Sequence, residues 1–336
     1  MQPSIEDVAA AAGVSTASVS RSLRGLKGVS EKTRNHVIEV ARDLGYSISP
    51  GAASLRTGRT RSIAVITPYI DRWFFGRALG GVESVLQQAD LQLVLHSLHG
   101  SAQARERLFE DRLLHRRVDA VLIMCLQLTD AEVEAIHGLG IPAVMLGAQA
   151  EGLFSVTIDD FSAARQAVRH LINLGHERIA LIGGRRDDPL HFTAPAERRA
   201  GYREALSAAS LPSPPELEVQ ADFTVRGGER AMASLLSLAE PPTAVFAESD
   251  EMAFGALKVL HDSRLRVPAG MSLVGFDDHE MSHLVNLTTI AQPVAEQGAA
   301  AARALLARLE QAEIPPLQAS FATELLIRGT TAPPRR

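Results

Sequence analysis

The chain has 336 residues, of which 46% are hydrophobic and 22% are charged, and its formal net charge is −5. It is too long for one hydrophobic core, and its composition is that of a globular protein rather than a disordered one. A single cysteine, Cys125, excludes an internal disulfide framework and fits a reducing cytoplasm. We find no basic-then-apolar signal pattern and no apolar run near the roughly 18 residues of a membrane span, so we expect a cytoplasmic protein with no membrane partner.

Charge is distributed unevenly along the chain. Residues 1–61 contain nine Lys and Arg against five Asp and Glu, whereas the remainder is acidic. A small basic head on an acidic body predicts that only the head contacts a polyanion.

The first 46 residues predict three short helices. Ser4, Ser15 and Ser30 are the expected N-caps, and Gly13 and Gly45 mark the ends of the first and third helices. Because only a Gly-Val turn separates the first two helices, they must cross steeply, as in a helix-turn-helix. The apolar residues expected to face inward are Ile5, Val8, Ala9, Ala12, Val14, Val19, Leu23, Val37, Ile38, Ala41 and Leu44.

The second helix lies within the segment GVSTASVSRSL, residues 13–23, which is small and polar. Its side chains expected to face outward are Thr16, Ala17, Ser18 and Arg21. Small side chains at a helix N-terminus let the backbone approach base edges closely. The hydroxyls of Ser15, Thr16 and Ser20 are suited to phosphates, and Arg21 can reach a guanine bidentately. A helical bundle with a merely solvated polar face is the alternative.

Residues 47–61, SISPGAASLRTGRTR, break the helical periodicity and add three arginines, which predicts a basic linker. Leu55 is unusual in a spacer. It is expected either to wedge into a minor groove or to pack on the neighbouring domain.

From residue 62 onward, short apolar runs alternate with helical segments. This pattern predicts an α/β architecture of the doubly wound type, formed twice, with a ligand cleft at the carboxyl ends of the strands. The predicted buried strands are 62–68, 91–98, 118–125, 141–147, 154–159, 178–184, 243–249 and 271–278.

Along essentially its whole length the chain resembles the lactose-repressor (LacI-type) family of bacterial transcription regulators. IEDVAAAAGVSTASVSRSL…VSEKTRNHVIEVARDLGY is similar to the family's DNA-binding signature, and SLRTGRTRSIAVI to its hinge and first strand. LINLGHERIALIGG, ERRAGYREAL, SDEMAFGAL, SLVGFDD and LTTI follow in the family's order. The resemblance implies an all-α helix-turn-helix head and a periplasmic-binding-protein-like core of two doubly wound subdomains.

The resemblance also implies a domain plan, with chain crossings near Asp160, Ala291 and Ser320. Its parts are a DNA-binding head (1–46), a hinge (47–61), an N-terminal core subdomain (62–160 and 292–320), a C-terminal one (161–291 and 321–331) and a tail (332–336). The tail lacks the heptad extension of tetrameric members, which implies a homodimer whose two heads read a near-palindromic operator.

Site residues follow from the same resemblance. The implied major-groove readers are Thr16, Ala17 and Arg21, and residues 52–56 should order into a hinge helix on the operator. SISPG replaces the usual Pro-Asn start of that hinge, and Gly51 raises the entropy cost of ordering it. The full implied set of DNA contacts is Ser4, Ser15, Thr16, Ala17, Ser18, Ser20, Arg21, Ser30, Thr33, Ala52, Leu55 and Arg56.

In the cleft, Arg198 and Asp277 match positions that commonly hold the effector, although Arg198 is alternatively a structural ion-pair partner. A carboxylate accepts two hydroxyl hydrogen bonds, and a guanidinium donates a fork. Phe74, Phe75 and Phe223 are expected either to stack on a ring or to pack in the core. The remaining effector contacts implied are Ser249 and Gln292. The implied effector is a sugar or sugar phosphate, with a nucleoside or purine as the alternative.

Other classes of function find less support. The chain has no G-x-G-x-x-G, P-loop or G-x-S-x-G motif, so we expect no enzyme and no cofactor. His96 and His99 lack neighbouring ligands, so we expect no metal site. A secreted sugar-binding protein would suit the core but not the basic head.

Overall fold

The computed structural model describes residues 3–46, 59–110, 117–310 and 318–335. The chain divides into two units, residues 1–61 and 62–336, which are considered separately. The hinge residues Ala52, Leu55 and Arg56 lie outside the described residues, so their predicted roles remain predictions.

The head contains the three predicted helices, α1 (Ile5–Ala12), α2 (Thr16–Leu23) and α3 (Glu31–Asp43). Each N-cap serine accepts a backbone N–H three residues on, and Ser4 forms a reciprocal capping box with Asp7. Gly13 and Gly45 follow the first and third helices in left-handed conformation, with φ of 65° and 68°. The predicted caps and stops of the head are therefore confirmed.

The head buries a small apolar cluster where its three helices meet. Val8, Val19 and Val37 are its fully buried members, and Val14 and Leu23 pack against it. The prediction of an inward-facing Ile38 and Leu44 is wrong, because these side chains are 38% and 40% exposed. Ile38 lies about 100° around α3 from the buried face, and Leu44 follows the end of the helix, where Val40 and Tyr46 pack instead.

The first lobe of the larger unit is a six-stranded parallel sheet in the order β11-β5-β4-β3-β1-β2. Its strands are β1 (Ser62–Thr67), β2 (Gln92–Ser97), β3 (Ala120–Met124), β4 (Ala143–Leu146), β5 (Phe154–Ile158) and β11 (Gln318–Phe321). Its helices are α5 (Trp73–Gln88), α6 (Ala102–Glu110), α7 (Asp130–Gly138) and α12 (Val294–Leu309).

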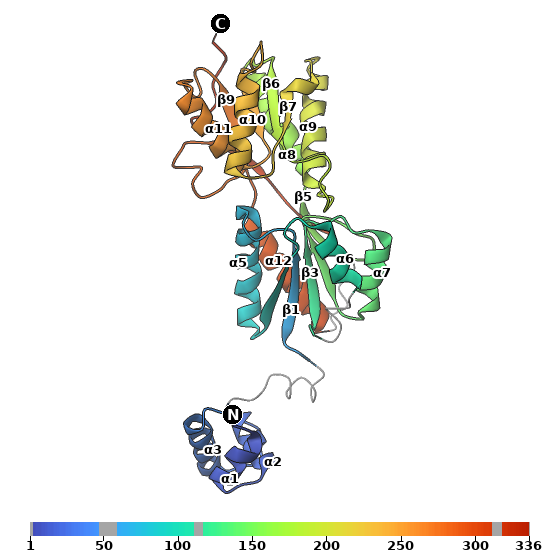
Figure 1. Ribbon diagram of the computed structural model, residues 1–336, viewed down its shortest axis with the longest axis vertical. Helices are drawn as coiled ribbons and strands as arrows, with labels where there is room; N and C mark the ends of the chain where they lie inside the picture. Colours follow the sequence, from blue (N-terminus) through green and yellow to red (C-terminus); the bar gives the residue numbers. More distant parts are fainter. Residues whose placement is uncertain (1–2, 47–58, 111–116, 311–317, 336) are drawn as a thin grey trace. The chain divides into compact units, whose positions relative to one another are not determined.

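Helices cover both faces of this sheet (Figure 1). Ile63 and Val65 of β1 pack under α5 and α12, whereas the alternate residues Ala64 and Ile66 pack under α6 and α7. A strand buried on both faces needs a continuous apolar run, which is why the sequence revealed β1, β3 and β4 clearly. The prediction that 91–98 is a buried strand is wrong, because β2 is an edge strand whose Val94 and Leu95 are 36% and 39% exposed.

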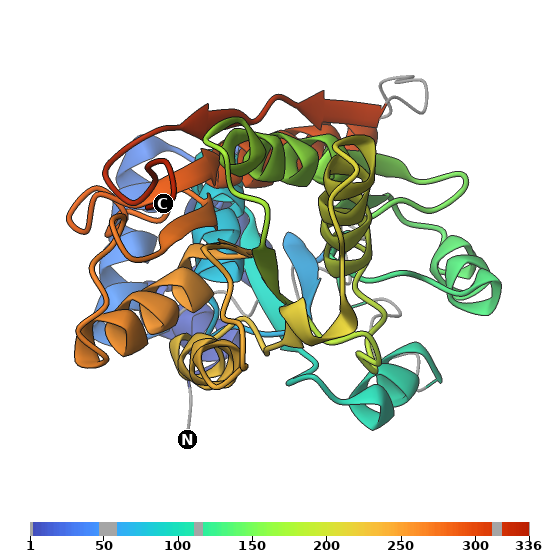
Figure 2. The same cartoon turned by 90° about the horizontal axis from the view of Figure 1, so that it is seen from above.

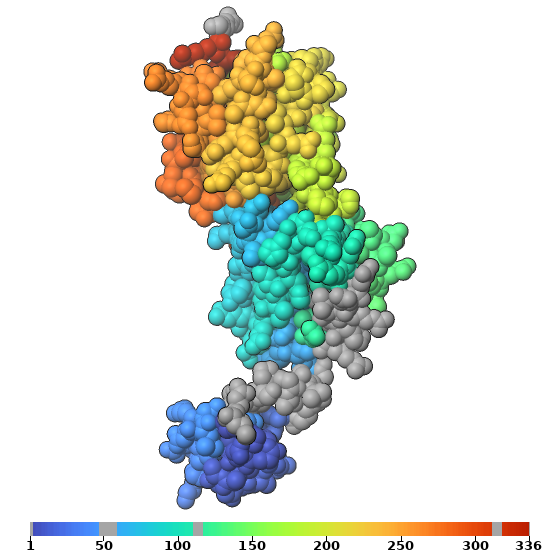
Figure 3. All heavy atoms as spheres, in the orientation of Figure 1, coloured from blue at the N-terminus to red at the C-terminus, as the bar shows by residue number. Residues whose placement is uncertain are grey.

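The second lobe is a six-stranded sheet in the order β12-β10-β9-β8-β6-β7, parallel except for β12. Its strands are β6 (Ile179–Gly183), β7 (Glu218–Gln220), β8 (Ala244–Ala247), β9 (Ser272–Asp277), β10 (Thr288–Ala291) and β12 (Glu324–Leu326). Helices α8 (Asp160–Asn173) and α9 (Ala194–Ala208) cover one face, and α10 (Val225–Leu236) and α11 (Asp250–Asp262) the other. The boundary between the two lobes is visible in Figure 3 as the change from yellow and orange to blue-green.

Three connections join the two lobes: β5 to α8, β10 to α12, and β11 to β12. Figure 2 shows the red strands β11 and β12 following one another across the last connection. The predicted crossing at Ser320 falls inside β11, because Phe321 still pairs with Ile158 of β5. The last crossing therefore comes after Phe321. Strands β7, β10, β11 and β12 are missing from the predicted set, since each is only three or four residues long. β7, β11 and β12 are also partly exposed, whereas β10 is buried but too short to stand out as an apolar run.

Candidate nucleic-acid interface and ligand pocket

The start of α2 presents a small polar surface. Ser15, Thr16, Ala17 and Arg21 are exposed, and Ser18 and Ser20 are half-buried. The hydroxyl of Ser15 lies 3.0 Å from that of Ser18 and also caps the helix. Arg21 forms no ion pair with any described carboxylate, so its guanidinium remains available to an external acceptor.

Ser4, Ser30 and Thr33 lie at the starts of the other two head helices. The Ser30 and Thr33 hydroxyls are 2.8 Å apart, and Ser4 accepts the N–H of Asp7. These hydroxyls are already engaged in capping. What each helix start offers to a phosphate is its positive dipole end, with the cap hydroxyls as secondary partners.

A cavity of about 300 Å³ lies between the two lobes of the larger unit. Its lining includes all seven residues predicted to contact an effector: Phe74, Phe75, Arg198, Phe223, Ser249, Asp277 and Gln292. They come from α5, α9, β9 and three connecting segments, so tertiary folding collects them from most of the core. The cavity is of the size that small ligands occupy.

Arg198 is an ion-pair partner, as one of the two alternatives predicted, and its contact with an effector stays a prediction. Its Nε donates to Asp160 at 2.7 Å, and its guanidinium carbon lies 3.6 Å from the centroid of the Phe276 ring. Arg198 is thus held in a buried ion pair and also lines the cavity, where it presents a prearranged positive charge.

Asp277 is the most constrained acid of the cavity. Its φ of 112° lies in the left-handed region that is costly for a residue with a Cβ. One carboxylate oxygen accepts Nε2 of Gln292 at 2.6 Å, and the Gln292 carbonyl accepts Nε2 of Gln297 at 2.9 Å. Burial raises the pKa of Asp277 to about 8, so this carboxyl changes charge near neutral pH.

The aromatic side chains both line the cavity and pack in or against the hydrophobic core. Phe74 and Phe75 lie in the first turn of α5, and their rings are perpendicular. Both line the cavity, but Phe75 is buried in the hydrophobic core, whereas Phe74 is partly buried and packs against that core. Phe223 also has a positive φ, of 56°, and its ring lies where a Cβ at Gly184 would be, so only glycine fits there.

Ser249 has a structural role as well as a place in the lining. It is nearly fully buried and caps α11 by accepting the N–H of Met252. Its hydroxyl therefore has limited capacity for a ligand.

Sequence reasoning missed several lining residues. Tyr69, Arg72, Asp160, Asp188, Phe192, Asp222, Glu251 and Gln297 also face the cavity. Tyr69 and Asp160 follow the ends of β1 and β5, where a parallel sheet binds ligands, so their positions carried a usable signal. Phe192 lies in a loop with no periodicity, and only the structure locates it.

Two kinds of site were sought separately. Within the described ranges, no three His, Cys, Asp or Glu side chains converge in a way that would hold a metal ion. None of the helices described is both long enough and apolar enough to traverse a bilayer.

The geometry defines a class of protein: a helix-turn-helix head that binds DNA, joined to a two-lobed core with a ligand cavity. Family models agree, since residues 4–49 match the bacterial regulatory proteins of the lacI family and residues 168–331 match the periplasmic binding protein-like domain. The chain belongs to the lacI family of bacterial transcriptional regulators.

Individual relatives support the same assignment. The HTH-type transcriptional repressor CytR of Escherichia coli is 36% identical over 334 residues, which cover 97% of this chain and 96% of CytR. A transcriptional regulator CelR–cellobiose complex is 34% identical, with a TM-score of 0.72, over 98% of this chain and 99% of that one. The lac repressor dimer bound to operator and the anti-inducer ONPF is 27% identical, with a TM-score of 0.84. The match covers 99% of this chain and 100% of that one. These relatives are regulators of transcription, not enzymes.

Proposed function

We propose that this protein is a cytoplasmic transcriptional repressor that binds a near-palindromic operator as a homodimer and responds to an uncharged sugar in its inter-lobe cavity. The observation that supports it best is the presence, in one chain, of an exposed small-residue α2 and of a cavity with a buried Arg198 and Asp277. The CelR relative holds cellobiose, which is an uncharged sugar.

The charges of the cavity favour a neutral ligand over a sugar phosphate. The described lining has five carboxylates and three arginines. Each arginine already faces a carboxylate: Arg72 faces Asp71, Arg185 faces Asp187, and Arg198 faces Asp160. Because the pKa of Asp277 is about 8, this acid is largely protonated at pH 7, and the other four carboxylates of the lining still outnumber the arginines. A phosphate would therefore add negative charge where acids are in excess and where each arginine already has a carboxylate partner.

A nucleoside is the second candidate, and the aromatic side chains favour it. Phe74, Phe223 and Phe192 offer faces or edges on which a base can stack, while Asp277 can accept two ribose hydroxyls. A purine or pyrimidine nucleoside is also uncharged, so it satisfies the same electrostatic argument.

Thermal shift of the full-length protein with cellobiose, cytidine and glucose 6-phosphate separates these classes. We expect one of the neutral compounds to stabilise the protein, by about 2.7 kcal/mol at about 100 times its Kd, and the phosphate to have no effect. Stabilisation by glucose 6-phosphate alone would contradict the neutral-ligand proposal.

DNA binding is tested independently by selection from a random duplex pool, followed by sedimentation with the selected site. We expect a near-palindromic site bound by two chains, with affinity that falls steeply as salt increases. A selected site without two-fold symmetry, bound by one chain, would contradict the homodimer.

A further inference from the structure

Residues 184–193, here called the strap, run from β6 to α9 and contain no helix or strand. By chain order the strap belongs to the second lobe. It supplies Arg185, Asp188, Phe192 and Thr193 to the cavity lining. The strap therefore forms part of the cavity wall.

The tip of the strap is buried in the opposite lobe. Leu190 is 0% exposed and belongs to the hydrophobic cluster of the first lobe, with Leu126 and Leu128. Phe192 packs against both clusters of that lobe, with its ring 6.0 Å from that of Tyr69. Burial of a leucine across a cleft indicates that the tip holds the two lobes together on this side.

Arg105 of α6 fixes that docked position. Its Nη1 donates to the backbone carbonyl of Leu190 at 2.9 Å, while Nε and Nη2 donate to Glu132 at 2.7 and 2.6 Å. Arg105 is itself only 6% exposed, and the fork on Glu132 leaves one N–H group aimed at the strap. Glu132 in turn caps the start of α7, so the anchor belongs to the rigid part of the first lobe.

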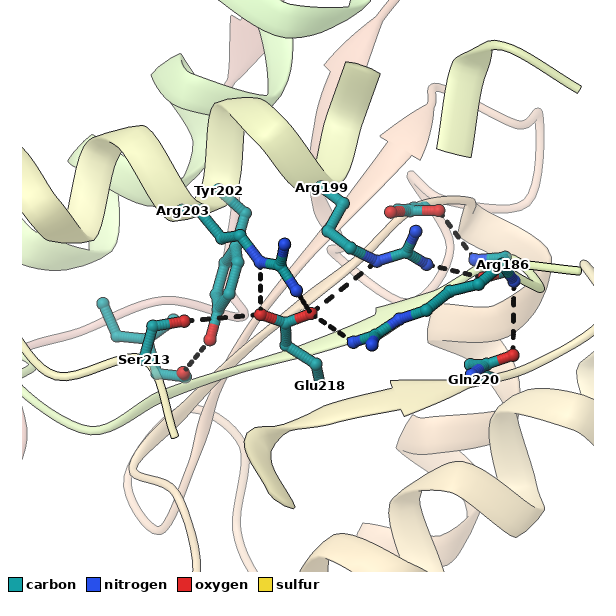
Figure 4. Close-up of polar contacts among 10 residues, drawn as sticks. Arg186, Arg199, Tyr202, Arg203, Ser213, Glu218 and Gln220 are labelled. Carbon is teal, nitrogen blue, oxygen red and sulfur yellow. Dashed lines mark hydrogen bonds and ion pairs between the residues drawn. The ribbon is translucent and has the colours of Figure 1, made fainter. Parts of the chain in front are cut away.

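The base of the strap is held to the second lobe by ion pairs and hydrogen bonds around Glu218 (Figure 4). Glu218 of β7 lies among Arg186, Arg199 and Arg203, and its side chain is only 3% exposed. Arg186 also donates its backbone N–H to the side chain of Gln220. Arg199 donates to the carbonyl of Gly184 at 2.7 Å.

The two ends of the strap differ in what a release would break. At the base, release would break the ion pair of Arg186 with the buried Glu218, the bond from the Arg186 backbone N–H to Gln220, and the bond from Arg199 to the carbonyl of Gly184. At the tip there is one leucine, one side-chain-to-backbone hydrogen bond and aromatic edge contacts. Within the strap the backbone bonds are local, from Leu190 and His191 to Asp188. Undocking the tip from the first lobe therefore requires less free energy than releasing the base from the second lobe.

The other side of the cavity is bridged separately. The backbone N–H of Trp73 in α5 donates to Glu251 of α11 at 3.2 Å, and its indole N–H donates to Glu280. Helices α5 and α6 lie on opposite faces of the first sheet, so Trp73 and the strap close the cavity from two sides.

We propose that the strap is the gate of the ligand cavity: its Leu190 tip undocks from the first lobe to admit a ligand while its Glu218 base stays in place, and Arg105 is the positioning residue that holds the gate shut. This inference rests on the cavity of the proposed function. It is tested without any effector or DNA, so its failure would leave the proposed function standing.

The lone cysteine provides the probe, because Cys125 lines the same cavity. We would measure the rate at which N-ethylmaleimide modifies Cys125 in the full-length protein, for wild type, Leu190→Ala and Leu235→Ala. Leu235 is the matched control, an equally buried leucine in the second lobe that does not touch the strap. We expect at least a tenfold faster modification in Leu190→Ala and little change in Leu235→Ala.

Arg105→Lys is the second variant, for the case in which Leu190→Ala does not fold. A lysine keeps the charge but cannot form the fork to Glu132 while also reaching Leu190, so Cys125 modification should again accelerate. The gate proposal would be wrong if the rate of Cys125 modification were unchanged in Leu190→Ala and Arg105→Lys. It would also be wrong if the rate rose equally in Leu235→Ala.

Discussion

The head and the core of this protein build their sites in opposite ways. In the head, the exposed α2 surface and its Ser15 cap lie within a few residues of one another, and a core of small side chains supports them. In the core, the cavity joins Phe74 to Gln292 across more than two hundred residues of chain. A reading surface can be made from one helix, whereas an enclosing cavity needs two lobes and three connections between them.

Deleting residues 1–61 is the largest test of this division of labour. The remaining core should lose specific operator binding by a factor of about 10³ or more, because the reading helix is gone. Its thermal stabilisation by a neutral ligand should be retained, because every cavity residue lies beyond residue 61. Fluorescence anisotropy with the selected operator and thermal shift measure the two effects. If the core alone still binds the operator, DNA binding is not confined to the head.

The Asp277→Asn variant tests ligand binding by the cavity of the core. Above its pKa of about 8, the ionised Asp277 can accept from both Gln292 and ligand hydroxyls, which an amide cannot, so ligand affinity at about pH 9 should fall by about 1.5–3 kcal/mol. Asp262→Asn is the control, since Asp262 pairs with Lys258 on the exposed side of α11. Isothermal titration with the ligand identified by thermal shift measures the change. Equal losses in both variants would indicate a general electrostatic effect rather than a contact.

Variants of Arg21 test base recognition by the head. Replacing Arg21 with Ala should cost about 1–3 kcal/mol at one base pair of each half-site and relax preference there. Arg21→Lys keeps the charge but loses the planar fork, so it should retain affinity for nonspecific DNA and still lose discrimination. Competition binding against single-base variants of the operator measures this. An unchanged ranking of those variants would remove Arg21 from the set of base readers.

A separate effect is expected on the pH dependence of core stability. Burial raises the pKa of Glu248 to about 8, and one of its oxygens has no hydrogen-bond partner among the described residues. An acid with a raised pKa in the folded state stabilises it most at low pH, and that contribution is lost as pH rises from about 4.5 through about 8. Glu248→Gln should therefore lose less stability than wild type between pH 5 and pH 8, as followed by urea denaturation. A parallel loss in both proteins would show that Glu248 does not titrate in this range.

Much of the architecture was predictable because it depends on local signals. Serine caps, left-handed glycines and continuous apolar strands are read directly from neighbouring residues, and these predictions held for α1, α2, α3 and the long buried strands. Ile38 shows where such reasoning fails, since an apolar residue one position away from the buried face of a helix still looks like core.

The sequence by itself determined the three-helix head, the two doubly wound lobes and the outward chemistry of α2, because each follows from the spacing of residues close together in the chain. Only the tertiary structure decided that Asp277 shares its carboxylate with Gln292, that Arg198 is paired with Asp160, and that Leu190 docks in the opposite lobe. The physical reason is that these contacts depend on how two separately folded sheets face each other, and no local pattern encodes that arrangement.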